Sequence, residues 1–187
     1  MNFDYSISTP PHLALGLVDH PEFAKQSAEL WQQMASYYAM ITPEGRGTVR
    51  VLPGFSDPLV RYRLTENDRR ELADGVRKLS ELLFEAGAVA LCPVLANARP
   101  MMTRDDVKAL PALLPSASSN LMTIHLFSSC PMGEDQSRCA TDSFGVVRGL
   151  KNLFIADASL LCTAPGVNPQ GTIMALARRN ALHFLSR

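Results

Sequence analysis

The most regular apolar pattern in the chain lies between residues 66 and 86. Apolar side chains recur there at intervals of three or four residues, at Leu72, Val76, Leu79 and Leu83. This spacing places them on one face of an α-helix. Thr65, with Asp68 three residues later, is typical of a capping box, and Gly87 suits the position just after a helix end. The pattern therefore predicts a helix over 66–86 whose apolar face belongs to the core.

Shorter patterns predict the other elements. A helix is expected to begin at Pro21 and to end near residue 35. Apolar or alternating runs predict short strands or extended pieces at 37–41, 48–52, 59–64, 88–95, 120–126 and 153–156. Residues 100–119 are rich in proline and serine and predict a loop with one or two helical turns, which is a lid or binding loop about as often as a plain surface loop. Strands and helices mix without a βαβ rhythm, which favours the α+β class.

The last helix has a strong start signal. Asn168 is a good N-cap, Pro169 suits the first helical position, and the helix is expected to run to about residue 185. The first N–H groups of a helix have no intrahelical partner, so this end attracts negative charge. Taken alone, the signal indicates a well-capped structural helix, because nearly every helix needs a cap.

Composition and charge exclude several classes of protein. The chain has 187 residues, of which 47% are hydrophobic, and this share is typical of a globular domain. The 18 basic and 18 acidic side chains balance, and no Lys/Arg cluster favours a nucleic acid partner. The longest apolar stretch, 86–96, is too short to span a bilayer, and no signal peptide opens the chain. A cytoplasmic location is therefore favoured.

The cysteines predict no metal site. Cys92, Cys130, Cys139 and Cys162 are too far apart for a C-x-x-C pair, and no histidine lies at zinc-finger spacing from them. We expect unbridged and mostly buried thiols.

His125 is the candidate for proton transfer. It follows an apolar run and precedes a turn of small residues. Histidine titrates close to neutral pH, so it suits a proton acceptor. A single histidine in this position is nevertheless more often a core residue than a catalyst, so His125 alone decides nothing. His12, His20 and His183 have no comparable surroundings.

Four ordered blocks of sequence change that balance. They are His-x-x-x-Ser-Cys-x-Met-Gly at 125–133, the segment 142–150, Asn-Leu-Phe-Ile-Ala-Asp-Ala-Ser at 152–159, and Gly-Val-Asn-Pro-Gln-Gly-Thr-Ile-Met-Ala at 166–175. Their order and spacing resemble the C-terminal region of the glucose–methanol–choline (GMC) flavoprotein oxidoreductases. The resemblance is greatest to the choline-dehydrogenase-like and long-chain-alcohol-oxidising branches. It is close over about 120–185 and looser back to about residue 37.

The resemblance implies an FAD-dependent oxidoreductase that acts on an alcohol. His125 matches the family's base, which takes the hydroxyl proton while a hydride leaves the alcohol carbon for the flavin. Asn168 matches the second active-site position, whose side chain hydrogen-bonds the substrate oxygen. The positions that match the family's cofactor contacts are Asp157, Ala158, Asn168, Pro169 and Gln170. Which alcohol is oxidised does not follow from the sequence.

The chain departs from the family pattern beside the histidine. The family has proline and then Gly-Thr or Gly-Ser in this block, whereas this chain has Leu126 and then Ser128-Ser129. Cys162 stands where proline is common. Because glycine lets the backbone approach a ligand closely, the loss of glycine at 128 is expected to alter how the loop meets the flavin.

The resemblance also implies a domain organisation. A mixed, largely antiparallel sheet with helices on one face is expected to form a substrate-binding domain over 1–148, although residues 1–36 add nothing to the resemblance. A strand and helix over 149–187 are expected to complete an FAD-binding domain. A dinucleotide site needs G-x-G-x-x-G, but the chain offers only Gly45-Arg46-Gly47 with Arg50 after it.

The chain is therefore expected to be a C-terminal fragment or separately encoded half. It would share FAD with an N-terminal nucleotide-binding part, in cis or in trans. The alternative is a non-catalytic remnant or accessory module that keeps this fold and binds a partner.

Overall fold

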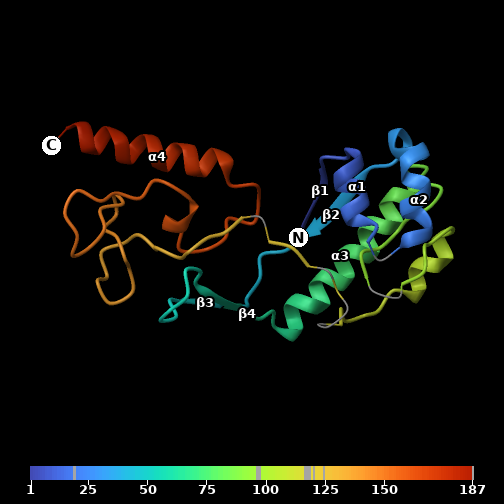
Figure 1. The fold of residues 1–187 in the computed structure, drawn as a ribbon, viewed down its shortest axis with the longest axis horizontal. Helices are drawn as coiled ribbons and strands as arrows, with labels where there is room; N and C mark the ends of the chain where they lie inside the picture. The colour runs from blue at the N-terminus through green and yellow to red at the C-terminus, as the bar shows by residue number, and fades with distance from the viewer. Residues whose placement is uncertain (19, 96–97, 116–118, 120, 124, 187) are drawn as a thin grey trace. The chain divides into compact units, whose positions relative to one another are not determined.

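The fold is known from a computed structural model, which describes residues 1–18, 20–95, 98–115, 119, 121–123 and 125–186. Within these residues the fold is α+β, with two small sheets and several helices (Figure 1). The chain divides into two compact units. Unit 1 comprises Met1–Thr48 and Arg61–Leu121, and unit 2 comprises Val49–Val60 and Met122–Arg187. The expected domain boundary at residue 148 stays a prediction.

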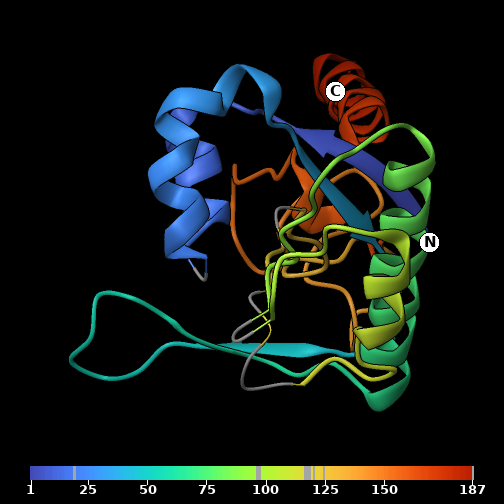
Figure 2. The same ribbon diagram turned by 90° about the vertical axis from the view of Figure 1, so that its right-hand side faces the viewer.

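Most of the regular structure belongs to the first half of the chain. The elements are β1 (Asn2–Ser6), α1 (Pro10–Gly16), α2 (Pro21–Leu30), the 3-10 helix η1 (Trp31–Gln33), β2 (Ser36–Met40), β3 (Gly47–Arg50), β4 (Leu59–Tyr62), α3 (Glu66–Glu85), the 3-10 helices η2 (Arg104–Ala109) and η3 (Ala158–Leu160), and α4 (Gln170–Leu185). Helices α1 and α2 pack against each other, as Figure 2 shows. No helix of the described residues is long and apolar enough to cross a membrane. The expected cytoplasmic location stays a prediction.

Helix α3 confirms the clearest sequence pattern. The Thr65 hydroxyl accepts from the Asp68 N–H, and the Asp68 carboxylate accepts from the Thr65 N–H, so the capping box is complete. Leu79 is buried and the rest of the predicted apolar stripe is half-buried. Gly87 follows the helix with a φ of 95°, a conformation that glycine adopts without a steric cost. The hydrophobic core of unit 1 packs beside this helix and comprises Ala73, Leu95, Met101, Val107, Leu110 and Leu114.

The predicted strands at 37–41 and 48–52 exist as β2 and β3, but they belong to different sheets. β2 pairs antiparallel with β1, with Phe3 opposite Ala39, and β3 pairs with β4. The turn between β2 and β3 bonds instead to the start of α3. There the buried Asp68 carboxylate accepts the N–H groups of Glu44 at 2.7 Å and Gly45 at 3.0 Å.

Three strand predictions are wrong. Among the described residues, 88–95 make only the isolated bridges Leu91–Met101 and Leu95–Ser119, and 153–156 make only the bridge Val146–Phe154. In the segment 120–126, residues 120 and 124 lie outside the described residues, and the others are irregular. An apolar run becomes a strand only where a second segment pairs along it, and the first and last of these runs pair only at isolated residues.

Two further expectations need correction. The helix predicted over 21–35 ends at Leu30 and continues as the 3-10 turn η1. The four cysteines form no disulfide, as expected, but they are less buried than expected, since Cys162 is exposed and the other three are half-buried.

Candidate functional site

The motif blocks identified in the sequence pack together in unit 2. The first and third blocks are joined by a hydrogen bond from the Cys130 N–H to the Ser159 carbonyl at 3.1 Å. The second and third are joined by one from the Ile155 N–H to the Gly145 carbonyl at 2.8 Å. Thr141 and Leu160 lie fully buried in this unit. Segments far apart in the sequence therefore form one local structure, although it contains little regular strand.

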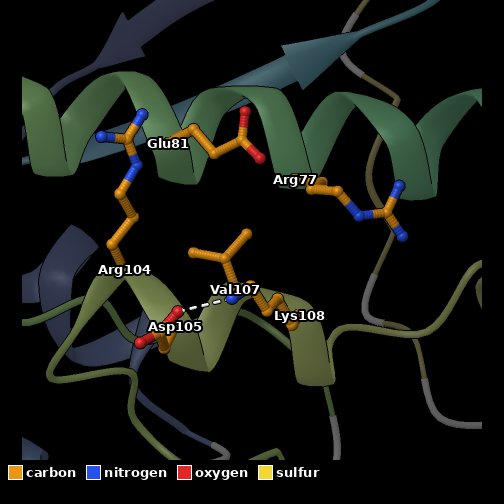
Figure 3. Close-up of a pocket in the computed structure, with 6 residues that line it drawn as sticks. All are labelled: Arg77, Glu81, Arg104, Asp105, Val107 and Lys108. Atoms are coloured by element: carbon orange, nitrogen blue, oxygen red, sulfur yellow. Dashed lines mark hydrogen bonds and ion pairs between the residues drawn. The ribbon is translucent and has the colours of Figure 1, made fainter.

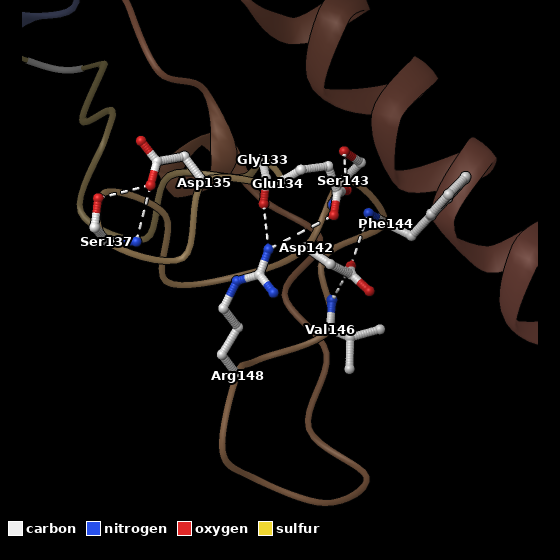
Figure 4. Close-up of polar contacts among 9 residues, drawn as sticks. All are labelled: Gly133, Glu134, Asp135, Ser137, Asp142, Ser143, Phe144, Val146 and Arg148. Atoms are coloured by element: carbon white, nitrogen blue, oxygen red, sulfur yellow. Dashed lines mark hydrogen bonds and ion pairs between the residues drawn. The ribbon is translucent and has the colours of Figure 1, made fainter.

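Acidic side chains organise the second block by binding its backbone (Figure 4). Glu134 accepts hydrogen bonds from the hydroxyl of Ser143 at 2.5 Å and from its N–H at 3.1 Å. Both bonds lower the pKa of the Glu134 carboxyl, and the bond from the hydroxyl has the larger effect. Asp142 accepts the N–H groups of Phe144 at 2.9 Å and Val146 at 3.0 Å. These carboxylates are thus acceptors that hold a turn. The sequence analysis did not single them out, because an acidic residue in a loop carries no distinctive signal.

Helix α4 is anchored on that turn. Arg179 donates to the Ser143 carbonyl, and its guanidinium lies 5.1 Å from the centre of the Phe144 ring. The other ring contact of Phe144 is with His183, stacked at 3.7 Å between ring centres. Asn180 is buried, and its side-chain oxygen accepts from Arg179. The fourth block is therefore fixed to the second by α4 side chains.

His125 lies on an irregular segment of unit 2 and is half-buried. Its ring centre is 6.2 Å from that of Phe127, with the planes tilted by 44°. Three residues further on, Ser128 has a φ of 64° and donates its hydroxyl hydrogen to the Leu161 carbonyl at 2.7 Å. The loop that carries His125 is thus bonded directly to the segment that follows Asp157 and Ala158.

Asp157 and Ala158 lie at the start of η3. The Asp157 carboxylate accepts the N–H of Ser159 at 2.8 Å and its hydroxyl at 2.5 Å, so it caps this turn. Asp157 is exposed, and Ala158 is half-buried.

The start of α4 differs by one residue from the prediction. The N-cap is Pro169, not Asn168, and the helix begins at Gln170. Proline suits either position, and the ψ of 2° at Pro169 departs from the helical value of about −42°. Asn168 and Gln170 are exposed, whereas Pro169 is buried. The convergence of His125 and Asn168 on one reaction centre stays a prediction.

The start of α4 suits an anionic group. Its N-cap is a proline, which has no side-chain acceptor for the first N–H groups, and Gln170 and Gly171 are exposed. An exposed helix N-terminus favours an anionic group. The start of η3 suits a cofactor less directly, because one carboxylate oxygen of Asp157 already accepts hydrogen bonds from Ser159.

Two pockets of the described residues lie elsewhere. One of about 470 Å³ lies between α3 and η2 in unit 1 and is lined by Arg77, Glu81, Arg104, Asp105, Val107 and Lys108 (Figure 3). Its cations are paired, Arg104 with Glu85 and Lys108 with Asp105. Another of about 370 Å³ is lined by Gln136, Asp142, Val146, Val147, Arg148 and Gly149. Neither contains a predicted site residue, and no three His, Cys, Asp or Glu side chains among the described residues are placed to hold a metal ion.

Comparison with known proteins identifies the family. The model of the family described as GMC oxidoreductase matches residues 43–177. The chain belongs to the GMC oxidoreductase family. It is 43% identical over 182 residues to an uncharacterized GMC-type oxidoreductase of Sinorhizobium fredii, a match that covers 97% of this chain and 36% of that protein. It therefore spans about a third of that relative's length.

Other family members match less closely. An uncharacterized GMC-type oxidoreductase of Mycobacterium tuberculosis is 32% identical over 176 residues, which are 91% of this chain and 27% of that one. A long-chain-alcohol oxidase of Arabidopsis thaliana is 28% identical over 166 residues, which are 82% of this chain and 21% of that one. The crystal structure of pyridoxine 4-oxidase from Mesorbium loti superposes with a TM-score of 0.52 at 19% identity, over 82% of this chain and 30% of that one. This last likeness confirms the fold. GMC oxidoreductases are in general FAD flavoproteins.

Proposed function

We propose that the chain is the C-terminal half of an FAD-dependent alcohol oxidoreductase, with His125 as the base that takes the hydroxyl proton. The observation that carries this proposal is the packing of the four motif blocks into one unit of a GMC family member. FAD, when bound, supplies the acceptor for the hydride that leaves the alcohol carbon. His125 receives the proton, and a positioned base of this kind typically accelerates a reaction by about 10²–10⁴-fold.

The other predicted residues have supporting roles in this proposal. The Asn168 amide hydrogen-bonds the substrate oxygen while charge develops on it. Pro169 and Gln170, at the start of α4, would lie against the flavin, where the helix dipole favours negative charge. Asp157 and Ala158 would hold the ribityl–pyrophosphate part of FAD.

The conformation of Ser128 supports a loop that keeps its family geometry. The family has glycine at this position, and Ser128 adopts the left-handed conformation that glycine favours. The replacement of glycine therefore leaves the backbone in a glycine-like conformation. For this reason the altered turn is no argument for a non-catalytic remnant.

Exposed apolar side chains on α4 support the proposal that the chain has a missing partner. Met174, Leu182 and Leu185 lie on one side of the helix and are 64%, 53% and 77% exposed. Asn180, on the opposite side of the helix, is buried. Arg178 is exposed on the same side as Met174 and Leu182, between them. Large apolar side chains that are exposed together often mark a contact surface. We assign this face to the N-terminal nucleotide-binding part, since the S. fredii relative has about two thirds of its length outside the match.

The experiment is complementation. The chain is mixed or co-expressed with the N-terminal part of the S. fredii relative, and alcohol-dependent loss of flavin absorbance is followed without oxygen. The panel of alcohols begins with long-chain alcohols and pyridoxine, the compounds named for two relatives. We expect no retained FAD in the chain alone and flavin reduction in the pair.

The role of His125 is tested in the same assay. His125→Gln is expected to lower the reduction rate by about 10²–10⁴-fold. The control is His12→Gln, because His12 is an exposed histidine of unit 1 that pairs locally with Thr9. An unchanged rate for His125→Gln would remove this residue from the mechanism.

A further inference from the structure

Ser128 combines two unusual features. It adopts a φ of 64°, which is unfavourable for residues other than glycine, and its side chain forms a hydrogen bond across 33 residues of sequence. Serine gains nothing over glycine from the backbone conformation. What serine adds at this position is the hydroxyl, and the hydroxyl donates to the Leu161 carbonyl at 2.7 Å.

This bond belongs to a short series of contacts between the His125 loop and the segment after Ala158. The N–H groups of Cys130 and Met132 donate to the carbonyls of Ser159 and Leu160 at 3.1 Å and 3.0 Å. Those two contacts use backbone atoms alone, so any residue there can make them. The Ser128 contact depends on its side chain, and among the three it lies nearest to His125 in sequence.

We infer that Ser128 is a positioning residue for His125, which acts by bonding the base-bearing loop to the segment that begins with Asp157 and Ala158. The inference rests on the proposed function, in which His125 is the base and this segment contacts FAD. The hydroxyl bond then fixes the distance between the base and the cofactor-contacting segment. A glycine at 128 allows the same backbone conformation but leaves this distance to the remaining contacts.

The test separates the hydroxyl from the backbone. Ser128→Gly removes the bond and relieves the unfavourable φ, whereas Ser128→Ala removes the bond and keeps the unfavourable φ. The matched control is Asn152→Gly, because Asn152 is the other residue besides glycine with a positive φ among the described residues, at 59°. It is exposed and is the first residue of the third block.

Two measurements are made on each variant. Heteronuclear NMR of the imidazole in the 187-residue chain reports the surroundings of His125, and flavin reduction in the complemented pair reports the rate. For Ser128→Gly we expect a changed imidazole signal and a rate about 10- to 100-fold lower at little change in KM, since a displaced base loses its alignment. Ser128→Ala is expected to lose rate similarly and to melt at a lower temperature than Ser128→Gly. Asn152→Gly should alter neither the signal nor the rate.

An imidazole signal in Ser128→Gly identical to that of the parent chain overturns the inference, and so does an unchanged rate. These outcomes differ from a failure of the proposed function. If His125→Gln keeps the full rate, His125 is not the base, whereas the NMR comparison still reports whether Ser128 positions its ring. If His125→Gln is inactive and Ser128→Gly is fully active, the positioning role alone is wrong.

Discussion

Gly145 and Ile155 meet backbone to backbone in unit 2. The Ile155 N–H donates to the Gly145 carbonyl at 2.8 Å, and a Cβ on Gly145 would lie 2.3 Å from the Ile155 carbonyl oxygen. Gly145 also has a φ of 82°. Gly145→Ala therefore introduces both a backbone clash and a strained conformation, and we expect it to lower the free energy of unfolding by about 2–4 kcal/mol. Urea unfolding followed by circular dichroism measures the loss.

The control for this variant is Gly149→Ala. Gly149 has a similar φ of 78°, but no atom lies within 4 Å of its added Cβ. Gly149→Ala should therefore lower the free energy of unfolding only by the cost of the left-handed backbone conformation, about 1 kcal/mol. Equal losses at both positions would show that the close approach between Gly145 and Ile155 does not exist in solution.

The buried carboxylate of Asp68 gives a prediction for pH dependence. Burial raises its pKa, but hydrogen bonds from Glu44, Thr65 and Gly45 outweigh burial and hold the pKa below the ordinary value of 3.8. A lowered pKa in the folded state means stability that is present above pH 3.8 and is lost as the pH falls through the lower folded value. Asp68→Asn should lower the free energy of unfolding by about 1–3 kcal/mol near neutral pH, because the asparagine amide turns an N–H group toward backbone donors.

The difference in the free energy of unfolding between the parent chain and Asp68→Asn should shrink as the pH falls below 3.8. Urea unfolding at a series of pH values measures it. Asp106→Asn is the comparison, because Asp106 makes the same kind of cap at Thr103 and also has a lowered pKa, but its carboxylate is exposed. A difference for Asp68→Asn that is constant across pH would contradict the assigned cause.

Arg179 is expected to stabilise unit 2 through packing as well as hydrogen bonding. Arg179→Ala removes the contact with the Phe144 ring and the donors to the Ser143 carbonyl and the Asn180 oxygen. We expect a loss of about 1–2 kcal/mol in urea unfolding. Arg178→Ala, at the adjacent exposed arginine, should have little effect. The assignment fails if the two variants unfold alike.

The exposed face of α4 is tested by adding charge. The double substitution Leu182→Asp and Leu185→Asp changes side chains that are exposed in this chain, so its circular dichroism should stay the same. Complementation by the N-terminal part should weaken about tenfold or more, since buried charge opposes docking. Leu15→Asp, at a leucine 61% exposed on α1, is the control. Full activity of the double variant would exclude this face as the contact.

Local sequence signals predicted the structure best at helix α3, where contacts within one segment determine it. Helix α3 follows from the reciprocal bonds of Thr65 and Asp68 and from its apolar stripe, all within one segment. The start of α4 was misplaced by one residue because proline suits both the N-cap and the first helical position. Strand β1 and its pairing with β2 were missed, because a pairing across some 30 residues has no local signal.

The candidate site was predictable in part. The order of the motif blocks identified the family, and the structure packs these blocks into one unit. The bonds that join them could not be predicted. The contact of Ser128 with Leu161 depends on a left-handed backbone conformation at a serine, for which the sequence has no signal. The carboxylates of Glu134 and Asp142 bind backbone donors that become neighbours only after folding.

The near absence of regular strands in unit 2 has a consequence for how this region diverges among homologues. A sheet tolerates many sequences because its bonds repeat, whereas here contacts that depend on one residue type, such as Ser128–Leu161 and Gly145–Ile155, each join two separate segments. A substitution in one block thus changes the surroundings of another. Chimeric proteins that inherit residues 128–162 from one parent should fold, and those with a crossover inside that interval should accumulate as insoluble protein.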